Sequence, residues 1–226
     1  MYVERRSSVP GAVVWRKTPD EDPAGQTPVL PDGCTDLIWL GDQLIVAGPD
    51  TRPQYGPVSD LDVIGLRFAP GTAPSVFGVP AEALRNRRVA LDQLWGSGEA
   101  QRAHLQVVTA VRRGAALEEL AGRRLGDVAA ANQLSRIARL CDAGWSTAAI
   151  AADTGWSERT LHRRAQHRFG YGTKTLTRIL RFQRAVGLIR AGRTLAEVAA
   201  GAGYADQSHL SREIRELAGA APTDLR

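Results

Sequence analysis

Residues 155–170 read GWSERTLHRRAQHRFG, and residues 203–219 read GYADQSHLSREIRELAG. Each stretch starts with a glycine and an aromatic residue and continues as a charged segment with apolar residues at helical spacing. The likeness extends upstream, because AIAADTGWSERTLHRR (149–164) aligns with EVAAGAGYADQSHLSRE (197–213) when one extra residue is allowed in the second copy. This internal repeat decides the fold of the C-terminal region.

Each copy of the repeat has the properties of a helix-turn-helix. Small alanines before the turn let two helices cross closely, and Gly155 and Gly203 can adopt the positive φ that a tight turn demands. Trp156 and Tyr204 then fill the angle between the helices. We therefore expect Leu161 in the first copy to face inward, and its counterpart Leu210 to do so in the second.

With these leucines inside, the polar side chains of each second helix must face outward. Arginine can bind guanine, glutamine can bind adenine, and serine, threonine and histidine can contact bases or phosphates. Sequence alone leaves open which contacts are to bases and which are to phosphates. The candidate DNA-binding residues are Ser157, Arg159, Thr160, His162, Arg163 and Gln166 in the first copy and Gln207, Ser208, His209, Ser211, Arg212 and Arg215 in the second.

The segment between the copies, TKTLTRILRFQRAVGLIRAG (173–192), is predicted to be a long helix with an apolar side. Its exposed side carries three candidate contacts to the DNA backbone, Lys174, Arg178 and Arg181. A rigid spacer would let two recognition helices enter successive major grooves, about 34 Å apart. The predicted units are helix-turn-helix 1 at 146–169, the linker helix at 173–191 and helix-turn-helix 2 at 194–218, with Ser157 and Thr173 as N-caps.

Charge is distributed unevenly along the 226 residues. From residue 131 onward there are 15 Lys and Arg against 8 Asp and Glu, whereas the first 130 residues hold 14 against 16. The basic excess thus belongs to the repeat region, as expected for a nucleic-acid binder joined to a second module. No apolar run approaches the roughly 18 residues of a membrane span, so we expect a cytoplasmic protein without membrane contact. Cys34 and Cys141 lie far apart, which favours buried free thiols over a disulfide or a metal site.

The first 130 residues predict a sheet followed by helices. Short apolar runs bounded by turn residues indicate strands at 13–15, 36–40, 43–47 and 62–68, the second and third joined as a hairpin by Gly41-Asp42. Helical periodicity replaces this pattern from Thr72, with short helices at 73–78, 80–85 and 89–95. A longer one at 99–113 carries Leu105, Val108 and Val111 along one side, a stripe that core packing or a dimer would equally explain. The strands would form a small sheet or partial barrel.

Four residues of this front region are candidates for an effector pocket: Trp15, Asp36, Trp39 and Arg67. Arg67 interrupts an apolar strand, and an inward-facing charge must be paired or bind an anion. The plainer alternatives are an outward arginine, aromatic residues that only pack the core, and a Pro31–Cys34 segment that only makes a turn. The residues do not decide between these possibilities.

The repeats, the linker helix and the ending GYADQSHLSREIRELAGAAPTDLR resemble the DNA-binding domain of AraC/XylS-type transcriptional regulators. Residues 30–51 and 65–96 resemble the N-terminal domain of a subset of this family. The resemblance implies an α+β chain: residues 1–128 form a small β-rich domain, reduced cupin-like or sandwich, with strands mainly at 1–70 and a helical layer at 72–128. Residues 129–226 would form an all-α double helix-turn-helix domain. It further implies double-stranded DNA as partner, with a small-molecule effector, RNA polymerase and a second copy of the chain as further candidates.

Other functions are less well supported by the residues. No P-loop, no Gly-x-Gly-x-x-Gly, no nucleophile–histidine–acid arrangement and no metal-spaced cluster is present, so we expect neither an enzyme nor a cofactor. A non-specific architectural DNA-binding protein is the closer alternative. It would share the basic repeats but would not select a defined site.

Overall fold

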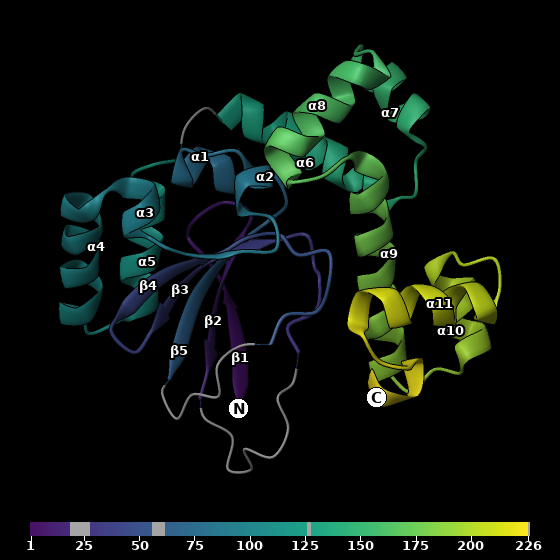
Figure 1. The fold of residues 1–226 in the computed structure, drawn as a ribbon, viewed down its shortest axis with the longest axis horizontal. Coiled ribbons are helices and arrows are strands. Elements are labelled where there is room, and N and C mark those ends of the chain that lie inside the picture. The colour runs from purple at the N-terminus through teal and green to yellow at the C-terminus, as the bar shows by residue number, and fades with distance from the viewer. Residues whose placement is uncertain (19–27, 56–61, 126–127, 226) are drawn as a thin grey trace.

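The computed structural model describes residues 1–18, 28–55, 62–125 and 128–225. Within them the chain is α+β, with a six-stranded sheet and its helices followed by a wholly helical region (Figure 1). Figure 1 shows α4 and α5 on the side of the sheet away from α9, α10 and α11. The predicted fold class is confirmed. The predicted domain boundary at 128/129 adjoins residues 126–127, which lie outside the described residues.

The described strands form one antiparallel sheet in the order β1-β2-β5-β3-β4-β6. The predicted hairpin is present, with Leu40 opposite Gln43, and Gly41 adopts a φ of +62° in the turn. Two strands, the first and the last, had not been predicted. The bounds are β1 Tyr2–Arg6, β2 Ala12–Lys17, β3 Thr35–Leu40, β4 Gln43–Ala47, β5 Val63–Phe68 and β6 Arg88–Ala90.

The helix predicted at 89–95 is wrong in its first part. Residues 88–90 form β6, which pairs with β4 so that Val89 stands opposite Val46, and the helix α3 covers only Asp92–Trp95. Both valines are buried in the sheet core. The residues of β6 are stabilised by pairing with β4, which is distant in the sequence. The local sequence pattern of the segment, which suggested a helix, does not reveal this pairing.

The two faces of the sheet differ in character. Leu37, Leu66 and Phe68 point to one face and are fully buried against the front helices. Strand register places Trp15, Gly65 and Ile38 in one row of the opposite face, and Arg67 and Asp36 in the next row. The first face therefore builds the core, and the second carries polar groups.

Five helices form the layer on the core face. The short α1 and α2 precede β6, and α5 contributes Leu117 and Leu120 to the core. The bounds are α1 Ala73–Phe77, α2 Ala81–Leu84, α3 Asp92–Trp95, α4 Ser97–Thr109 and α5 Arg113–Gly122. Their order agrees with the predicted helical layer.

The apolar stripe of the helix predicted at 99–113 does not face the core. Helix α4 ends at Thr109 and buries the smaller residues Ala100, Ala103 and Val107 instead. Leu105 is 53% exposed and Val108 is 40% exposed. The bulky Trp39 ring already lies 5.2 Å from the His104 ring beneath α4, so only small side chains fit on the sheet side.

The C-terminal helices follow the prediction closely, and glycines end them. Gly155 and Gly203 both adopt the left-handed conformation at helix C-caps, with φ of +70° and +83°. Thr173, predicted as an N-cap, is instead buried and shares a 3.1 Å hydrogen bond with the Thr147 hydroxyl, while Gly172 occupies the cap. The bounds are α6 Val128–Asp142, α7 Thr147–Thr154, α8 Glu158–Phe169, α9 Thr173–Arg190, α10 Leu195–Ala202, α11 Gln207–Ala218 and the 3-10 helix η1 Pro222–Leu225.

Helix α9 joins two separate cores. Its first half places Leu176 and Ile179 among the buried residues of α6, α7 and α8. Its second half places Phe182 and Val186 among those of α10 and α11. Each helix-turn-helix is therefore a small folded unit mounted on one end of the same helix.

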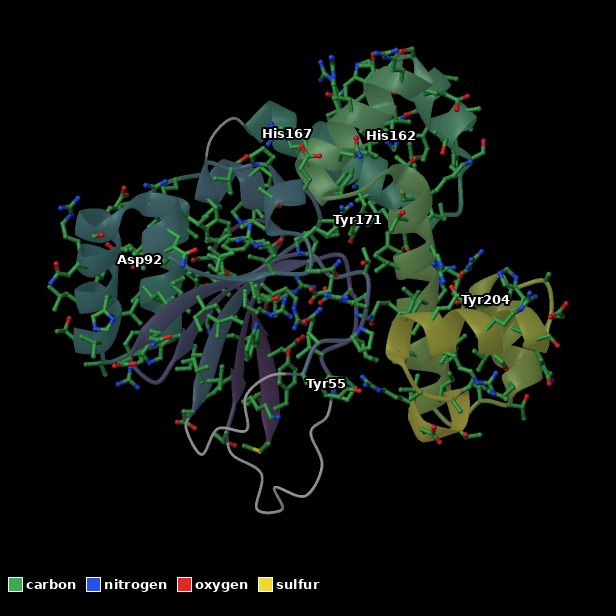
Figure 2. The ribbon with its side chains drawn as sticks, viewed as in Figure 1. Tyr55, Asp92, His162, His167, Tyr171 and Tyr204 are labelled. Atoms are coloured by element: carbon green, nitrogen blue, oxygen red, sulfur yellow. The ribbon has the colours of Figure 1, made fainter. Side chains whose placement is uncertain are left out.

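The front domain packs against the first of these units. The Phe169 ring at the end of α8 lies so close to Gly71 that a Cβ there would stand 2.8 Å from it. Arg85 donates to the Gly170 carbonyl at 3.3 Å, and Gln183 of α9 donates to the Pro31 carbonyl at 2.6 Å. Figure 2 shows Tyr171 at this junction between the front domain and α9.

Candidate nucleic-acid interface and sensor face

The first helix-turn-helix is built from α7 and α8. Ser146 caps α7, Gly155 ends it, and the Trp156 amide donates back to the Ala151 carbonyl at 3.0 Å. Ser157 then caps α8. Because Leu161, Ala165 and Phe169 are buried, the opposite side of α8 must face solvent.

The predicted DNA-binding residues of α8 lie on this outer side. Arg159, His162 and Arg163 are exposed, and Gln166 is half-buried. Ser157 and Thr160 bind each other. The Ser157 hydroxyl accepts a hydrogen bond from the Thr160 amide at 3.2 Å and donates one to the Thr160 hydroxyl at 3.0 Å. The structure thus gives Ser157 a capping role next to its predicted role at DNA.

The second helix-turn-helix is built from α10 and α11. Thr194 and Glu197 form a capping box at the start of α10. Asp206 caps α11 by accepting from the His209 amide at 2.7 Å. The buried Leu210 anchors α11, as predicted, and Tyr204 is buried at the turn.

The outer side of α11 carries the second set of predicted DNA-binding residues. Gln207, Ser208, Arg212 and Arg215 are exposed. Ser211 and His209 are half-buried, and the His209 ring lies edge-on to Tyr204 with centroids 5.1 Å apart. The His209 ring therefore also supports the turn.

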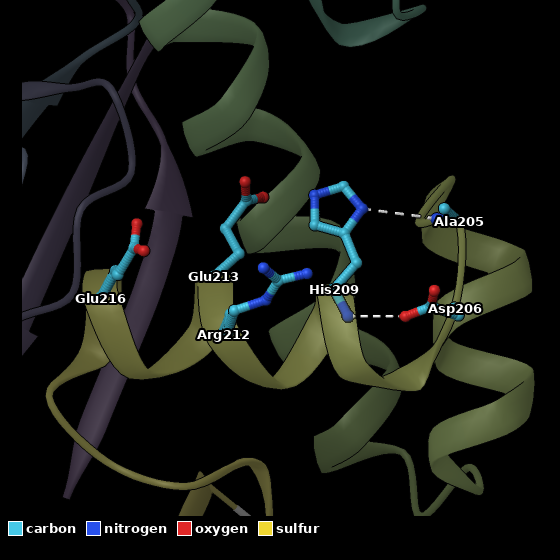
Figure 3. A pocket seen from close by; sticks show the side chains of 6 residues that line it. All are labelled: Ala205, Asp206, His209, Arg212, Glu213 and Glu216. Carbon is cyan, nitrogen blue, oxygen red and sulfur yellow. Dashed lines mark hydrogen bonds between the residues drawn. The ribbon is translucent and has the colours of Figure 1, made fainter.

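A hollow of about 420 Å³ runs along α11 (Figure 3). Its lining combines the predicted DNA-binding residues His209 and Arg212 with three acidic residues. Figure 3 shows their side chains along one side of the helix. The lining residues are Ala205, Asp206, His209, Arg212, Glu213 and Glu216.

Two of the three candidate backbone contacts on α9, Arg178 and Arg181, have acidic partners within the protein. Arg178 donates to Glu213 at 3.0 Å and also pairs with Glu216, and Arg181 donates to Glu213 at 2.7 Å. Lys174 is exposed. For Arg178 and Arg181 a contact to the DNA backbone stays a prediction, in competition with these ion pairs.

The second sheet face brings three of the four predicted effector-pocket residues together. The Trp15 indole nitrogen donates to the Asp36 carboxylate at 2.5 Å, and Arg67 Nε lies 3.4 Å from the same carboxylate. The indole crosses the strand over Gly65, where a Cβ would stand 2.2 Å from the ring. Trp39 does not join them, because alternation along β3 puts it on the core face, so its predicted place in the pocket is wrong.

Arg67 is surrounded by acids. It lies 3.3 Å from Asp32 and 3.2 Å from Glu4, in addition to Asp36. Burial raises the pKa of Asp36 to about 6, although the Arg67 charge acts in the opposite direction. Glu4 lies on β1 and was not found from the sequence, since a strand with every residue exposed shows no apolar alternation.

The Asp32–Cys34 segment makes a turn, and Asp32 in addition faces Arg67. The Asp32 carboxylate accepts from the Cys34 amide at 2.9 Å. Burial raises the pKa of the Cys34 thiol, and Cys141 is buried in the core beside α9, so neither is activated as a nucleophile. Across the described part of the chain, both cysteines are free and no cluster of His, Cys, Asp and Glu could hold a metal ion. None of the described helices is long and apolar enough to cross a membrane.

Two family models match the chain. Residues 150–226 match a family described as a helix-turn-helix domain, and residues 12–90 match a domain of unknown function, DUF6597. A search of curated proteins found no match.

Solved structures with similar folds include ToxT from Vibrio cholerae, at 12% identity over 94% of this chain and 96% of that chain, with a TM-score of 0.48. A probable AraC family transcriptional regulator from Rhodopseudomonas palustris is 24% identical over 42% of this chain and 94% of that chain, with a TM-score of 0.37. The transcriptional regulator CdpR from Pseudomonas aeruginosa is 18% identical over 99% of this chain and 70% of that chain, with a TM-score of 0.34.

The family match at 150–226 falls on the two helix-turn-helix units and their shared helix. The family match and the two helix pairs therefore identify residues 150–226 as a helix-turn-helix domain in which the motif occurs twice. The helix-turn-helix is a DNA-binding motif.

Proposed function

We propose that the protein binds a defined, bipartite DNA site, with α8 and α11 entering successive major grooves on one face of the duplex. The observation that carries this proposal is the mounting of two exposed, basic recognition helices on one continuous helix. Helix α9 has 18 residues, and is therefore about 27 Å long. That length is of the order of the roughly 34 Å between successive major grooves.

Selection of binding sites from random duplexes tests this proposal. A regulator should recover two short conserved blocks separated by about one helical turn. An architectural DNA-binding protein, the alternative, should recover none, although its affinity would fall with salt in the same way. The alternative is less well supported, because two distinct sets of side chains on α8 and α11 suit direct reading of bases.

We further propose that the second sheet face takes a small-molecule effector. The Arg67 cluster offers both charge signs beside the largely buried Trp15 ring. A thermal-shift screen of the full chain against metabolite classes tests this role, with Arg67→Ala as the variant that should lose any shift. A ligand that stabilises both proteins equally would place the effector elsewhere.

Self-association is proposed through α4. Its exposed Leu105 and Val108 lie on the side of the front domain away from the two readers, so a second copy would leave α8 and α11 free. Burying these side chains against a symmetry mate would remove apolar surface from water. Sedimentation of the wild type and of Leu105→Ser/Val108→Ser should show a dimer for the first and a monomer for the second, while a wild type that is monomeric at all concentrations would refute this role.

A further inference from the structure

The two recognition helices are held by different contacts. In the aligned repeats, Glu213 of α11 occupies the position that Arg164 has in α8. Glu213 is only 5% exposed, whereas Arg164 is exposed. A buried acid inside the one strongly basic region of the chain calls for a physical explanation, because an unpaired buried charge is strongly unfavourable.

Glu213 ties α11 to the middle of α9. Arg181 reaches its carboxylate through both Nε and Nη2, at 3.1 and 2.7 Å, and Arg178 Nε reaches it at 3.0 Å. The Arg181 guanidinium also lies 4.7 Å from the centroid of the Tyr204 ring at the turn of the same unit (Figure 2). Burial is the largest single effect and opposes the charge of Glu213, but the hydrogen bonds and charge of Arg181, together with the Tyr204 hydroxyl and a hydrogen bond from Arg178, outweigh it, so the pKa of the carboxyl lies below its usual value.

Among the described residues, no equivalent ion pair joins α8 to α9. Arg164 lies 4.2 Å from the centroid of the Trp156 ring of its own unit and faces solvent. The end of α8 is held by the front domain instead, where Phe169 packs against Gly71 and Arg168 donates to the Ser75 hydroxyl at 3.2 Å. The end of α8 thus gains contacts from the front domain in addition to its packing on α9, whereas the ion pairs of Glu213 fix α11 to α9.

We propose that Glu213 is a positioning residue of the second recognition helix, α11. It fixes the rotation of α11 on α9 before DNA binds. This inference rests on the proposed site-specific binding. Arg212 is the preceding residue of α11, so a rotation of α11 fixed by Glu213 also fixes the direction in which the Arg212 side chain leaves the helix. A recognition helix that is already held in place does not pay the entropic cost of ordering when DNA binds. More of the free energy of its contacts with the bases is then available to distinguish the selected site from other DNA sequences.

The test compares Glu213→Gln with Glu216→Gln on the same helix. Glu216 is exposed, and among the described residues its ion pair is to Arg178. Each variant removes one acid, and this alone should strengthen binding to any DNA. The readout is therefore the ratio of affinity for the selected site to affinity for a scrambled duplex at one salt concentration. We expect Glu213→Gln to lower this ratio by roughly tenfold and Glu216→Gln to leave it unchanged. Equal ratios for the two variants would overturn the proposal.

A double-mutant cycle with Arg181→Gln separates the clamp from a phosphate contact. If Arg181 acts through Glu213, the double variant should be no worse than either single variant. Losses that add would mean that Arg181 contacts DNA on its own, and the clamp role would be lost. Should Glu213→Gln fail to fold, Arg181→Lys, which keeps the charge but cannot make the two-nitrogen contact, replaces it in the comparison.

Amide hydrogen exchange of the free protein tests the clamp without DNA. Glu213→Gln should speed exchange in α11 and leave α8 unchanged, and unchanged protection in α11 would contradict the proposal. This measurement also separates the two levels of inference. A wild type that selects no DNA site refutes the proposed function, while the exchange result still decides the role of Glu213.

Discussion

At the scale of single residues, the sheet face of the front domain carries an acid with an unusual proton affinity. Asp36 has a pKa of about 6 in the folded chain because it is buried, with Arg67 and the Trp15 indole acting against the shift and Asp32 adding to it. The folded state therefore binds a proton that the unfolded state, with the ordinary value near 3.8, releases. The stability contributed by this proton is fully present below about pH 4 and is lost as the pH rises through 6.

We predict from this that Asp36→Asn flattens the pH dependence of stability between pH 4 and 7. The wild type should lose up to about 2 kcal/mol relative to the variant over this range. Chemical denaturation at a series of pH values measures the difference, with the exposed hairpin residue Asp42→Asn as the control. Parallel curves for the wild type and Asp36→Asn would show that Asp36 ionises normally.

Two arginines give a second prediction at this scale. Arg163 and Arg212 are exposed at equivalent positions of α8 and α11. Substitution by alanine should weaken DNA binding without changing the melting temperature, by about 1–3 kcal/mol for a residue that reads a base, with relaxed preference at one position of the site. A phosphate contact would instead weaken all sequences and reduce the salt dependence. Arg190→Ala, an exposed position outside both readers, controls for the loss of charge in a salt-controlled titration.

At the scale of elements, the sequence predicted helices whose ends are marked by nearby residues better than strands that depend on pairing with distant segments. The helices of the C-terminal region were predicted from their glycines and caps, such as Gly155 and Ser157, because these act within a few residues. Strands β1 and β6 were missed because only their partners define them. The assignment of Trp39 to the pocket failed for a related reason. Strand alternation shows that Trp39 and Asp36 point to opposite faces of the sheet, but the sequence does not show which of the two faces the helices cover.

The exposed strand β1 is held by one acid of α5. Glu118 accepts from Arg5 at 2.7 Å, from the Ser7 hydroxyl at 2.7 Å and from the Ser8 amide at 2.7 Å. These bonds, that from Arg5 first, lower its pKa to about 2. The stability that ionised Glu118 contributes to the fold is present above pH 4.5, its ordinary pKa, and is lost as the pH falls toward 2.

We predict that Glu118→Gln costs about 2 kcal/mol at pH 7, a value reduced for the exposure of Arg5, and that this cost shrinks on acidification. Its neighbour Glu119 is exposed and pairs with Arg123 four residues on, so Glu119→Gln should cost less than about 0.5 kcal/mol. Urea unfolding at pH 7 and pH 3 makes the comparison. Equal effects of the two substitutions would mean that β1 does not depend on this tie.

At the scale of the whole molecule, the front domain packs against the first helix-turn-helix unit, which is formed by α7 and α8. Phe169 is 1% exposed, and its ring contacts Gly71 of the front domain while belonging to the core of the first reader. Two modules joined in this way should unfold together. A signal received on the sheet face would then reach α8 through packed side chains, whereas α11 keeps its place on α9 through Glu213.

The last prediction follows from this junction. Phe169→Ala should remove about 3 kcal/mol of stability and separate the unfolding of the front domain from that of the first helix-turn-helix, because the ring belongs to the core of that unit and also packs against the front domain. Val107→Ala, in the front core away from the junction, should lower stability without separating the transitions. Calorimetry distinguishes the two outcomes. A single shifted transition for Phe169→Ala would show that the polar contacts of Arg85 and Arg168 suffice to couple the modules, and that the junction does not depend on the aromatic ring.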